Sequence, residues 1–148
     1  MLLTTVVGLC LLGAPEVKFE HPTDEAPLII VPVKLNGKGP FRFVLDTGAS
    51  GSVVTPKAAK ALGLHGSGTA KAIGAGGSTD VMLTRLDSLE LGGEKVTGLT
   101  LAIDEMKDVS AVVPNLDGIV GYDFLRRFVL EIDYPASTLR LHAPAPAK

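Results

Sequence analysis

The sequence has a single cysteine, Cys10, and only three histidines, which are His21, His65 and His142. One cysteine excludes an intrachain disulfide. The histidines lie far apart along the chain, and no Cys or His spacing resembles that of a zinc site. We therefore expect no metal ion and no other cofactor.

The sequence also lacks tryptophan, and it mixes charges of both signs, with 14 Lys and Arg residues against 16 Asp and Glu residues. It contains no basic block and no alternation of basic and aromatic residues, so nucleic acid is not expected as a partner. The length of 148 residues indicates one domain, which is large enough to bury a core without disulfides.

No apolar run is long enough to span a bilayer, and the N-terminal run over residues 1–14 falls short of that length. Two interpretations of residues 1–15 stay open. The segment resembles the apolar part of a secretory signal peptide, with Ala14 as the small residue before cleavage, although the usual basic start is absent. The alternative is an N-terminal strand that packs on the domain. The first interpretation implies export to the periplasm or the exterior, and the localisation stays open between the two.

Glycine, by contrast, is plentiful, and the 17 glycines separate short apolar runs. This pattern is typical of many short strands joined by tight turns. Asn36-Gly37 is a strong hairpin signal, and the turn over residues 36–40 separates strands predicted over residues 28–35 and 41–46. Further hairpin turns are predicted at Gly92-Gly93 and over residues 133–137.

Two short helices are expected within this pattern. Thr55 is a good N-cap, Pro56 suits the first helical position, and Gly63 suits a left-handed end. A second short helix is predicted after Gly121. Residues 104–108, "DEMKD", are acidic but lack the spacing of a calcium loop, so we expect a solvated loop there. The predicted fold class is therefore mostly β.

Residues 43–50, "FVLDTGAS", end an apolar strand abruptly on Asp46. A carboxyl group at the edge of a core is costly unless it caps a turn or has another use. A lone Asp-Thr-Gly triplet is most simply a turn. Here the triplet follows a strand, precedes small residues, and is matched later by Ile119-Val120-Gly121, which again leads into a helix.

With these residues, the chain resembles the retropepsin-like aspartic proteases, the single-lobe relatives of pepsin. The resemblance covers residues 25–142 and rests on "FVLDTGAS", on "AIGAGG" at 72–77, and on "LDGIVGYDFL" at 116–125. It implies a small closed β-barrel-like lobe, two of which make one active site. Residues 16–24 are then a linker, and the Pro-rich residues 143–148 are a flexible tail.

The resemblance implies a catalytic role for Asp46. Peptide hydrolysis by this route uses two carboxyl groups and one water, and one group takes a proton while the other donates one. Because the chain has only one Asp-Thr-Gly, the inference is a homodimer in which each Asp46 meets its copy across a two-fold axis. The partners are thus a second copy and a peptide or protein substrate.

The resemblance also assigns roles to the neighbours of Asp46. Thr47 bonds to its counterpart in the second chain, or else is an ordinary turn hydroxyl. Gly48 lets the backbone approach closely. Ala49 lacks the hydroxyl that pepsin-like enzymes often carry there, so we expect activity at weakly rather than strongly acidic pH. Ser50 completes the loop. The predicted brace beneath the loop consists of Ile119, Val120 and Gly121.

The glycine-rich segment resembles the flap, a hairpin that covers the substrate. The predicted flap residues are Ile73, Gly74, Ala75, Gly76 and Gly77. A surface loop without substrate contact is the alternative. Apolar side chains at Ile73, Val120 and Phe124 predict cleavage between apolar residues.

Several alternatives stay open at the level of sequence. Asp117, Asp123 and Asp133 are each an alternative second acid within one chain, and Asp117 lies closest to the brace. A non-catalytic peptide-binding or dimerisation module on the same fold is the main rival function. A self-processing element that cuts only its precursor or a partner is another. A dinucleotide loop at "GAGGST" and a serine-hydrolase elbow at "GASGS" are disfavoured by their context.

Overall fold

The computed structural model describes residues 13–22, 27–74 and 77–146, and it has the predicted mostly-β fold. The strands are β1 Val17–Lys18, β2 Ile30–Leu35, β3 Lys38–Leu45, β4 Val53–Val54, β5 Gly66–Gly74, β6 Gly77–Leu91, β7 Glu94–Ile103, β8 Gly118–Val120, β9 Val129–Asp133 and β10 Thr138–His142. The helices are α1 Pro56–Leu62, α2 Lys107–Val112 and α3 Tyr122–Leu125.

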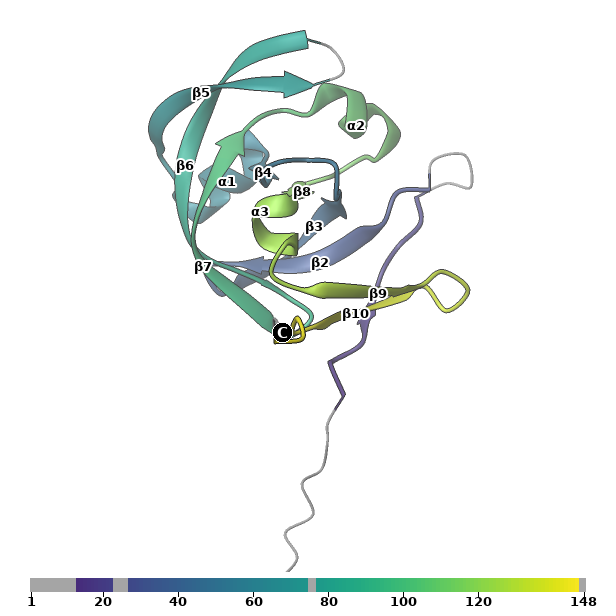
Figure 1. Cartoon of the computed structure of the whole chain (residues 1–148). Coiled ribbons are helices and arrows are strands. Elements are labelled where there is room, and N and C mark those ends of the chain that lie inside the picture. Colours follow the sequence, from purple (N-terminus) through teal and green to yellow (C-terminus); the bar gives the residue numbers. More distant parts are fainter. Residues whose placement is uncertain (1–12, 23–26, 75–76, 147–148) are drawn as a thin grey trace, which may run out of the picture.

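Six strands form a closed barrel in the order β2-β3-β8-β4-β7-β6. The ring closes where β2 returns to β6, with Lys34 opposite Glu90 and Leu35 opposite Leu89. β5 lies outside the ring and pairs with the first part of β6. These two strands form an arm that arches over β4 and α2 (Figure 1). The closed lobe predicted from the sequence is confirmed.

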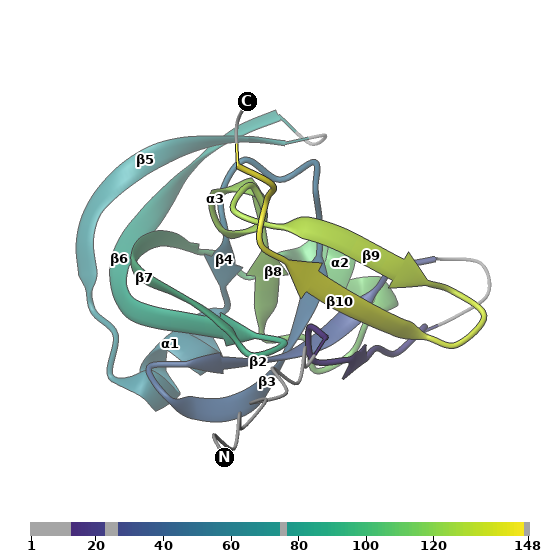
Figure 2. The ribbon, with the colours of Figure 1, turned by 60° about the horizontal axis from the view of Figure 1, so that its bottom comes forward.

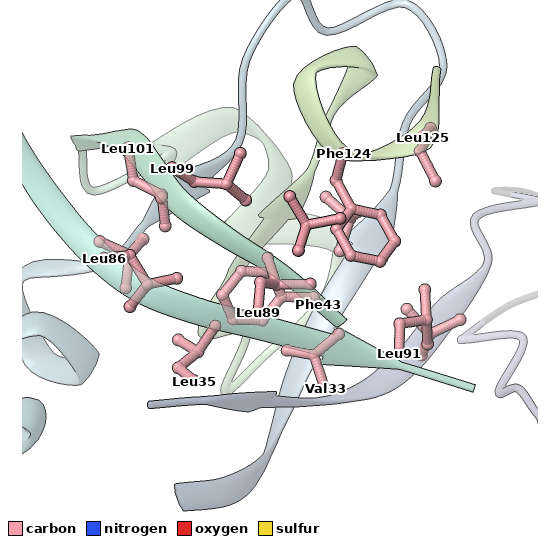
Figure 3. Close-up of a cluster of buried hydrophobic side chains, with 14 of the residues drawn as sticks. Val33, Leu35, Phe43, Leu86, Leu89, Leu91, Leu99, Leu101, Phe124 and Leu125 are labelled. Atoms are coloured by element: carbon pink, nitrogen blue, oxygen red, sulfur yellow. The ribbon is translucent and has the colours of Figure 1, made fainter. Parts of the chain in front are cut away.

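The barrel interior is filled by aliphatic side chains from facing strands. In β2, Val31, Val33 and Leu35 are buried while Pro32 and Lys34 are exposed, as the two-residue period of a strand requires. Figure 3 shows Val33 and Leu35 in the same cluster as leucines of β6 and β7 and the ring of Phe124 from α3. A second, smaller cluster lies beside this core, and it consists of Ile30, Val44, Met106, Val113 and Leu116.

The segment expected to be a linker contributes to the fold instead. Val17–Lys18 forms β1, which pairs with β10 in a three-stranded sheet of order β1-β10-β9. Val17 and Phe19 are buried in the main core, and each such side chain stabilises the fold by about 1.5–3 kcal/mol. The prediction of a linker over residues 16–24 is therefore wrong for residues 17–19. The local sequence does not show that Val17 and Phe19 pack against residues from distant parts of the chain.

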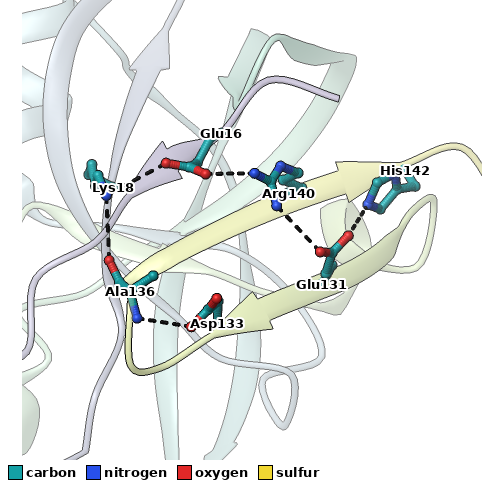
Figure 4. A network of polar contacts seen from close by, with 7 residues as sticks. All are labelled: Glu16, Lys18, Glu131, Asp133, Ala136, Arg140 and His142. Carbon is teal, nitrogen blue, oxygen red and sulfur yellow. Dashed lines mark hydrogen bonds and ion pairs between the residues drawn. The ribbon is translucent and has the colours of Figure 1, made fainter. Parts of the chain in front are cut away.

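Charged side chains connect the same three strands on their outer face. Arg140 contacts Glu16 at 2.6 Å and Glu131 at 3.4 Å, and Glu131 contacts His142 at 2.7 Å (Figure 4). Such exposed pairs contribute little to stability, so the buried residues beneath them hold β1 in place. The β9–β10 hairpin lies on the opposite side of the barrel from the β5–β6 arm (Figure 2).

The predicted turns and the first helix are confirmed, with shifted boundaries. Thr55 caps α1 by accepting a hydrogen bond from the Ala58 amide, and Gly63 adopts the left-handed conformation with φ of 68°. The first hairpin turn is confined to Asn36 and Gly37, both with positive φ, so β3 begins at Lys38 rather than at residue 41. Two residues with positive φ fit the right-handed twist of a hairpin.

The solvated loop predicted over residues 104–108 is wrong at its C-terminal end, where α2 begins at Lys107. Asp104 Oδ1 accepts a hydrogen bond of 2.6 Å from the Met106 amide, and Met106 itself is buried in the second cluster. The helix is short and has no buried residue of its own. The segment nevertheless has apolar residues spaced by three and four positions, as on one face of a helix, and they belong to or pack against the second cluster: Met106, Val109, Val113 and Leu116. The prediction of a loop overlooked this spacing.

Some expectations fall outside the described residues. The signal-peptide or strand interpretation concerns residues 1–12 for the most part, and residues 147–148 belong to the predicted tail. Residues 143–146 have no helix or strand and are exposed. Among the described helices, none is long and apolar enough to cross a membrane.

Replacing Leu89 with alanine tests the barrel core. Leu89 is fully buried where β2 and β6 close the ring, so the cavity should lower the free energy of unfolding by about 2–5 kcal/mol. Val112→Ala is the control, because Val112 is 45% exposed on α2 and its loss should change stability by less than about 0.5 kcal/mol. Urea denaturation measures both, and equal losses would contradict this core.

Candidate active site

Asp46 lies directly after β3, at the point where that strand leaves the barrel. β3 pairs in parallel with β8, and Leu45 stands opposite Val120. The Asp46 amide continues this ladder by donating to the Val120 carbonyl at 3.0 Å. The backbone of Asp46 is thus fixed by the sheet, while its side chain is half-buried at the surface of the lobe.

The carboxyl group of Asp46 is bound by its own loop. Oδ1 accepts a hydrogen bond of 2.8 Å from the Gly48 amide. A Cβ at Gly48 would stand 3.2 Å from the same oxygen, so glycine allows the amide to approach this closely. The two roles considered for Asp46, capping a turn and presenting an acid, are therefore combined: the turn itself orients the carboxyl group.

The other predicted loop residues are at the surface. Thr47, Gly48 and Ser50 are exposed, and Ala49 is half-buried. The Ala49 carbonyl accepts a hydrogen bond of 2.8 Å from the Tyr122 amide. This bond connects the middle of the loop to the first residue of α3.

Residues 118–121 lie against the loop from below, and their side chains point in different directions. Val120 is fully buried in the main core, while Ile119 is half-buried and packs against the second cluster. A Cβ at Gly121 would stand 2.5 Å from the backbone of Gly51, so only glycine fits there without displacing the loop. Gly118 is equally confined, because a Cβ there would collide with Phe43 and with the Val53 carbonyl.

A hollow of about 420 Å³ lies between the β5–β6 arm, β4, β8 and α2. Its apolar wall includes Val53, Ala102, Ile119 and Val109, and the arm contributes Ile73. Asp46 is not part of the wall. Asp46 is nevertheless near the hollow in the fold. It follows β3, and β3 is paired with β8, which carries Ile119. Asp104, Lys107 and Asp108 also line the hollow and make it partly charged.

The predicted flap residues lie at the end of the arm. β5 and β6 pair as far as Gly74 opposite Gly77, and Ile73 is 87% exposed. Ala75 and Gly76 are outside the described residues. The arm is thus a hairpin that carries an uncovered apolar side chain beside the hollow.

Two residues expected near the substrate do not reach the surface. Val120 and Phe124 are both completely buried in the barrel core, so the prediction that they contact substrate side chains is wrong. Met106 and Val109, which were not predicted as site residues, do line the hollow.

Each of the alternative acids accepts a hydrogen bond from another residue of the chain. Asp117 Oδ2 accepts a hydrogen bond of 2.9 Å from the Arg42 amide, which fixes the chain before β8. Asp123 Oδ1 accepts one of 2.7 Å from the Ser52 hydroxyl. Asp133 caps the last hairpin turn through the Ala136 amide. Among the described residues, no group of three acidic, histidine or cysteine side chains is arranged to hold a metal ion.

Two solved structures are similar to this chain in fold. A retropepsin-like aspartic protease from Rickettsia conorii superimposes with a TM-score of 0.56 at 18% identity, covering 85% of this chain and 86% of that one. The retroviral protease-like domain of Ddi1 from Leishmania major superimposes with a TM-score of 0.51 at 18% identity, covering 80% and 94%. The fold is therefore retropepsin-like.

The sequence itself matches the family model described as aspartyl protease over residues 31–124. The chain belongs to this aspartyl protease family. The match includes the Asp46 loop, the arm, β8 and the first part of α3. No curated protein sequence matches the chain.

Replacing Gly121 with alanine tests the support under the loop. The added methyl group would overlap the Gly51 backbone, so we expect a loss of about 1–3 kcal/mol in unfolding free energy and shifted amide resonances over residues 46–52. Urea denaturation and amide NMR spectra measure the two effects. Gly13→Ala is the control, because no atom lies within 4 Å of a Cβ at Gly13. Unchanged loop resonances in Gly121→Ala would contradict the close contact.

Proposed function

We propose that the protein is an aspartic endopeptidase that acts as a homodimer, with one Asp46 carboxyl group from each chain. The observation that carries this proposal is the placement of Asp46: half-buried, at the exit of a core strand, and oriented by the Gly48 amide. The family match and the retropepsin-like fold support the same conclusion.

A second copy supplies the second acid in this proposal. General acid/base hydrolysis needs two carboxyl groups in different protonation states, and each chain has one Asp-Thr-Gly. Of the nearby acids, Asp117 accepts a hydrogen bond from the Arg42 amide, and Asp123 accepts one from the buried Ser52 hydroxyl. A two-fold arrangement satisfies the chemistry with the residue that each chain does present.

In the proposed reaction, the two Asp46 carboxyl groups share one proton, so that one is ionised and the other is protonated. The ionised carboxyl group of the pair takes a proton from a water molecule, and the water oxygen attacks the peptide carbonyl carbon. The protonated carboxyl group gives its proton to the carbonyl oxygen, so a neutral tetrahedral diol forms. The carboxyl group that took the proton from water then gives it to the amide nitrogen, while the other carboxyl group takes a proton from one diol hydroxyl. The C–N bond breaks, an amine and a carboxylic acid leave, and the pair again holds one proton. Ala49 offers no hydroxyl to the pair, which supports activity at weakly acidic pH.

The hollow beside the loop is suited to an apolar substrate side chain. Its walls are aliphatic at Val53, Ala102 and Ile119, and its volume of about 420 Å³ admits a large residue. The arm with Ile73 forms one side, so closure over a bound peptide would bury that exposed side chain.

Replacing Asp46 with asparagine is the central test. Asparagine keeps the shape of the side chain but cannot accept the proton from water, so peptide cleavage should be lost while folding is retained. Asp87→Asn is the matched control, because Asp87 is exposed on β6 and should keep full activity. Cleavage of a mixed peptide library by both variants and the wild type measures this.

Protein concentration separates the dimeric from the monomeric site. The wild type should gain activity per chain as concentration rises, until the dimer is fully formed. If the Asp46→Asn variant cuts as well as the wild type, the aspartic mechanism is refuted. A folded, dimeric wild type without cleavage across acidic and neutral pH would favour the non-catalytic binding module.

Replacing Ile73 with serine tests the role of the arm. Ile73 is already exposed in the free protein, so stability should stay within about 0.5 kcal/mol of the wild type. Burial of Ile73 against substrate would be lost, and KM should rise roughly tenfold, as expected when about 1.5 kcal/mol of apolar burial disappears. Met82→Ser is the control, because Met82 is 51% exposed on β6 and lies outside the hollow. Equal KM values for both variants would contradict the flap role.

A further inference from the structure

A buried polar pair lies between the Asp46 loop and the start of α3. Ser52, at the end of the loop, is only 1% exposed. Its hydroxyl oxygen accepts a hydrogen bond of 3.0 Å from the Gly121 amide. The same hydroxyl donates to Asp123 Oδ1 at 2.7 Å. Because the Gly121 N–H is a donor only, the single hydroxyl proton of Ser52 is directed to Asp123.

One carboxylate oxygen of the pair is expected to destabilise the folded protein. Asp123 Oδ1 also accepts a hydrogen bond of 2.9 Å from the Phe124 amide, but Asp123 Oδ2 is buried and has no hydrogen-bond partner in the described structure. A buried polar atom without a partner destabilises the folded state. A carboxyl group in this position is therefore not explained by stability alone, and such groups call for another explanation.

The location of the pair supplies that explanation. The loop is attached to residues 120–123 at three points along its length. Asp46 donates to Val120 at 3.0 Å, and Ala49 accepts from Tyr122 at 2.8 Å. Both of these bonds join backbone groups. The third point, Ser52 with Gly121 and Asp123, is the one that depends on side chains.

We propose that Ser52 and Asp123 are positioning residues that hold the Asp46 loop in the geometry needed for catalysis. Asp123 acts through Ser52, because it orients the hydroxyl so that its oxygen faces the Gly121 amide. That contact holds Gly121 against the backbone of Gly51, and so it determines the position of the loop relative to β8. This inference rests on the proposed function, in which two copies of Asp46 must meet closely.

The expected effect is on turnover rather than on substrate affinity. A displacement of catalytic groups by about 1 Å can reduce the rate up to a hundredfold. Ser52→Ala should therefore lower kcat roughly ten- to hundredfold, with KM little changed, because neither residue lines the hollow. Asp123→Asn keeps an oxygen acceptor for Ser52 and should keep most of the wild-type kcat.

Thr84→Val is the matched control. Thr84 is also 1% exposed, and its hydroxyl donates to the His65 carbonyl at 2.8 Å, away from the Asp46 loop. It should lose stability as Ser52→Ala does but keep the wild-type kcat. Amide hydrogen exchange gives a readout independent of activity, and Gly121 should exchange faster in Ser52→Ala but not in Thr84→Val.

The outcomes separate this inference from the proposed function. A normal kcat in folded Ser52→Ala, or equal losses in Ser52→Ala and Thr84→Val, overturns the positioning role while the peptidase stands. If Asp123→Asn is as inactive as Asp46→Asn, with normal exchange at Gly121, Asp123 takes part in the chemistry and the positioning role is again overturned. A wild type without turnover refutes the proposed function, and the positioning role with it.

Discussion

The insertion of β8 between β3 and β4 is the constraint on which the site depends. β8 pairs in parallel with β3 and antiparallel with β4, so one strand of three residues touches both strands that flank the Asp46 loop. This places Gly118 against Phe43 and Gly121 against Gly51, where no larger residue fits. The loop is therefore built on the barrel core: the strands beneath it fix the backbone of Asp46, and the Gly48 amide orients its carboxyl group.

The lobe combines a closely packed barrel with an exposed arm. The barrel closes through β2 and β6, and its interior is continuously packed with aliphatic residues. The β5–β6 arm extends beyond the ring and carries Ile73 almost fully exposed. Ile73 on the arm lines the hollow, while Asp46 follows β3, the strand paired with β8, which carries Ile119 in the wall of the hollow.

Local signals in the sequence were reliable where a few adjacent residues decide the structure. Thr55, Pro56 and Gly63 predicted α1 because capping and left-handed termination act within one turn of helix. Asn36-Gly37 predicted the first hairpin for the same reason. α2 was missed because it has only six residues, so its apolar spacing is short, and because Met106, which precedes it, is buried in part by the distant residues Ile30 and Val44. The burial of Val17 and Phe19 was not predicted, because the strand that β1 pairs with, β10, lies at the other end of the chain.

The sequence by itself determined the class of fold, the family resemblance and the identity of Asp46 as the acid to examine, because these depend on short motifs and their order. Only the tertiary structure decided which residues line the hollow. It buried Val120 and Phe124, exposed Ile73, and brought Met106 and Val109 to the cleft. It also joined Ser52 to Asp123 beneath the loop. Burial and hydrogen bonding between residues far apart in the chain arise only from packing, and no local pattern records them.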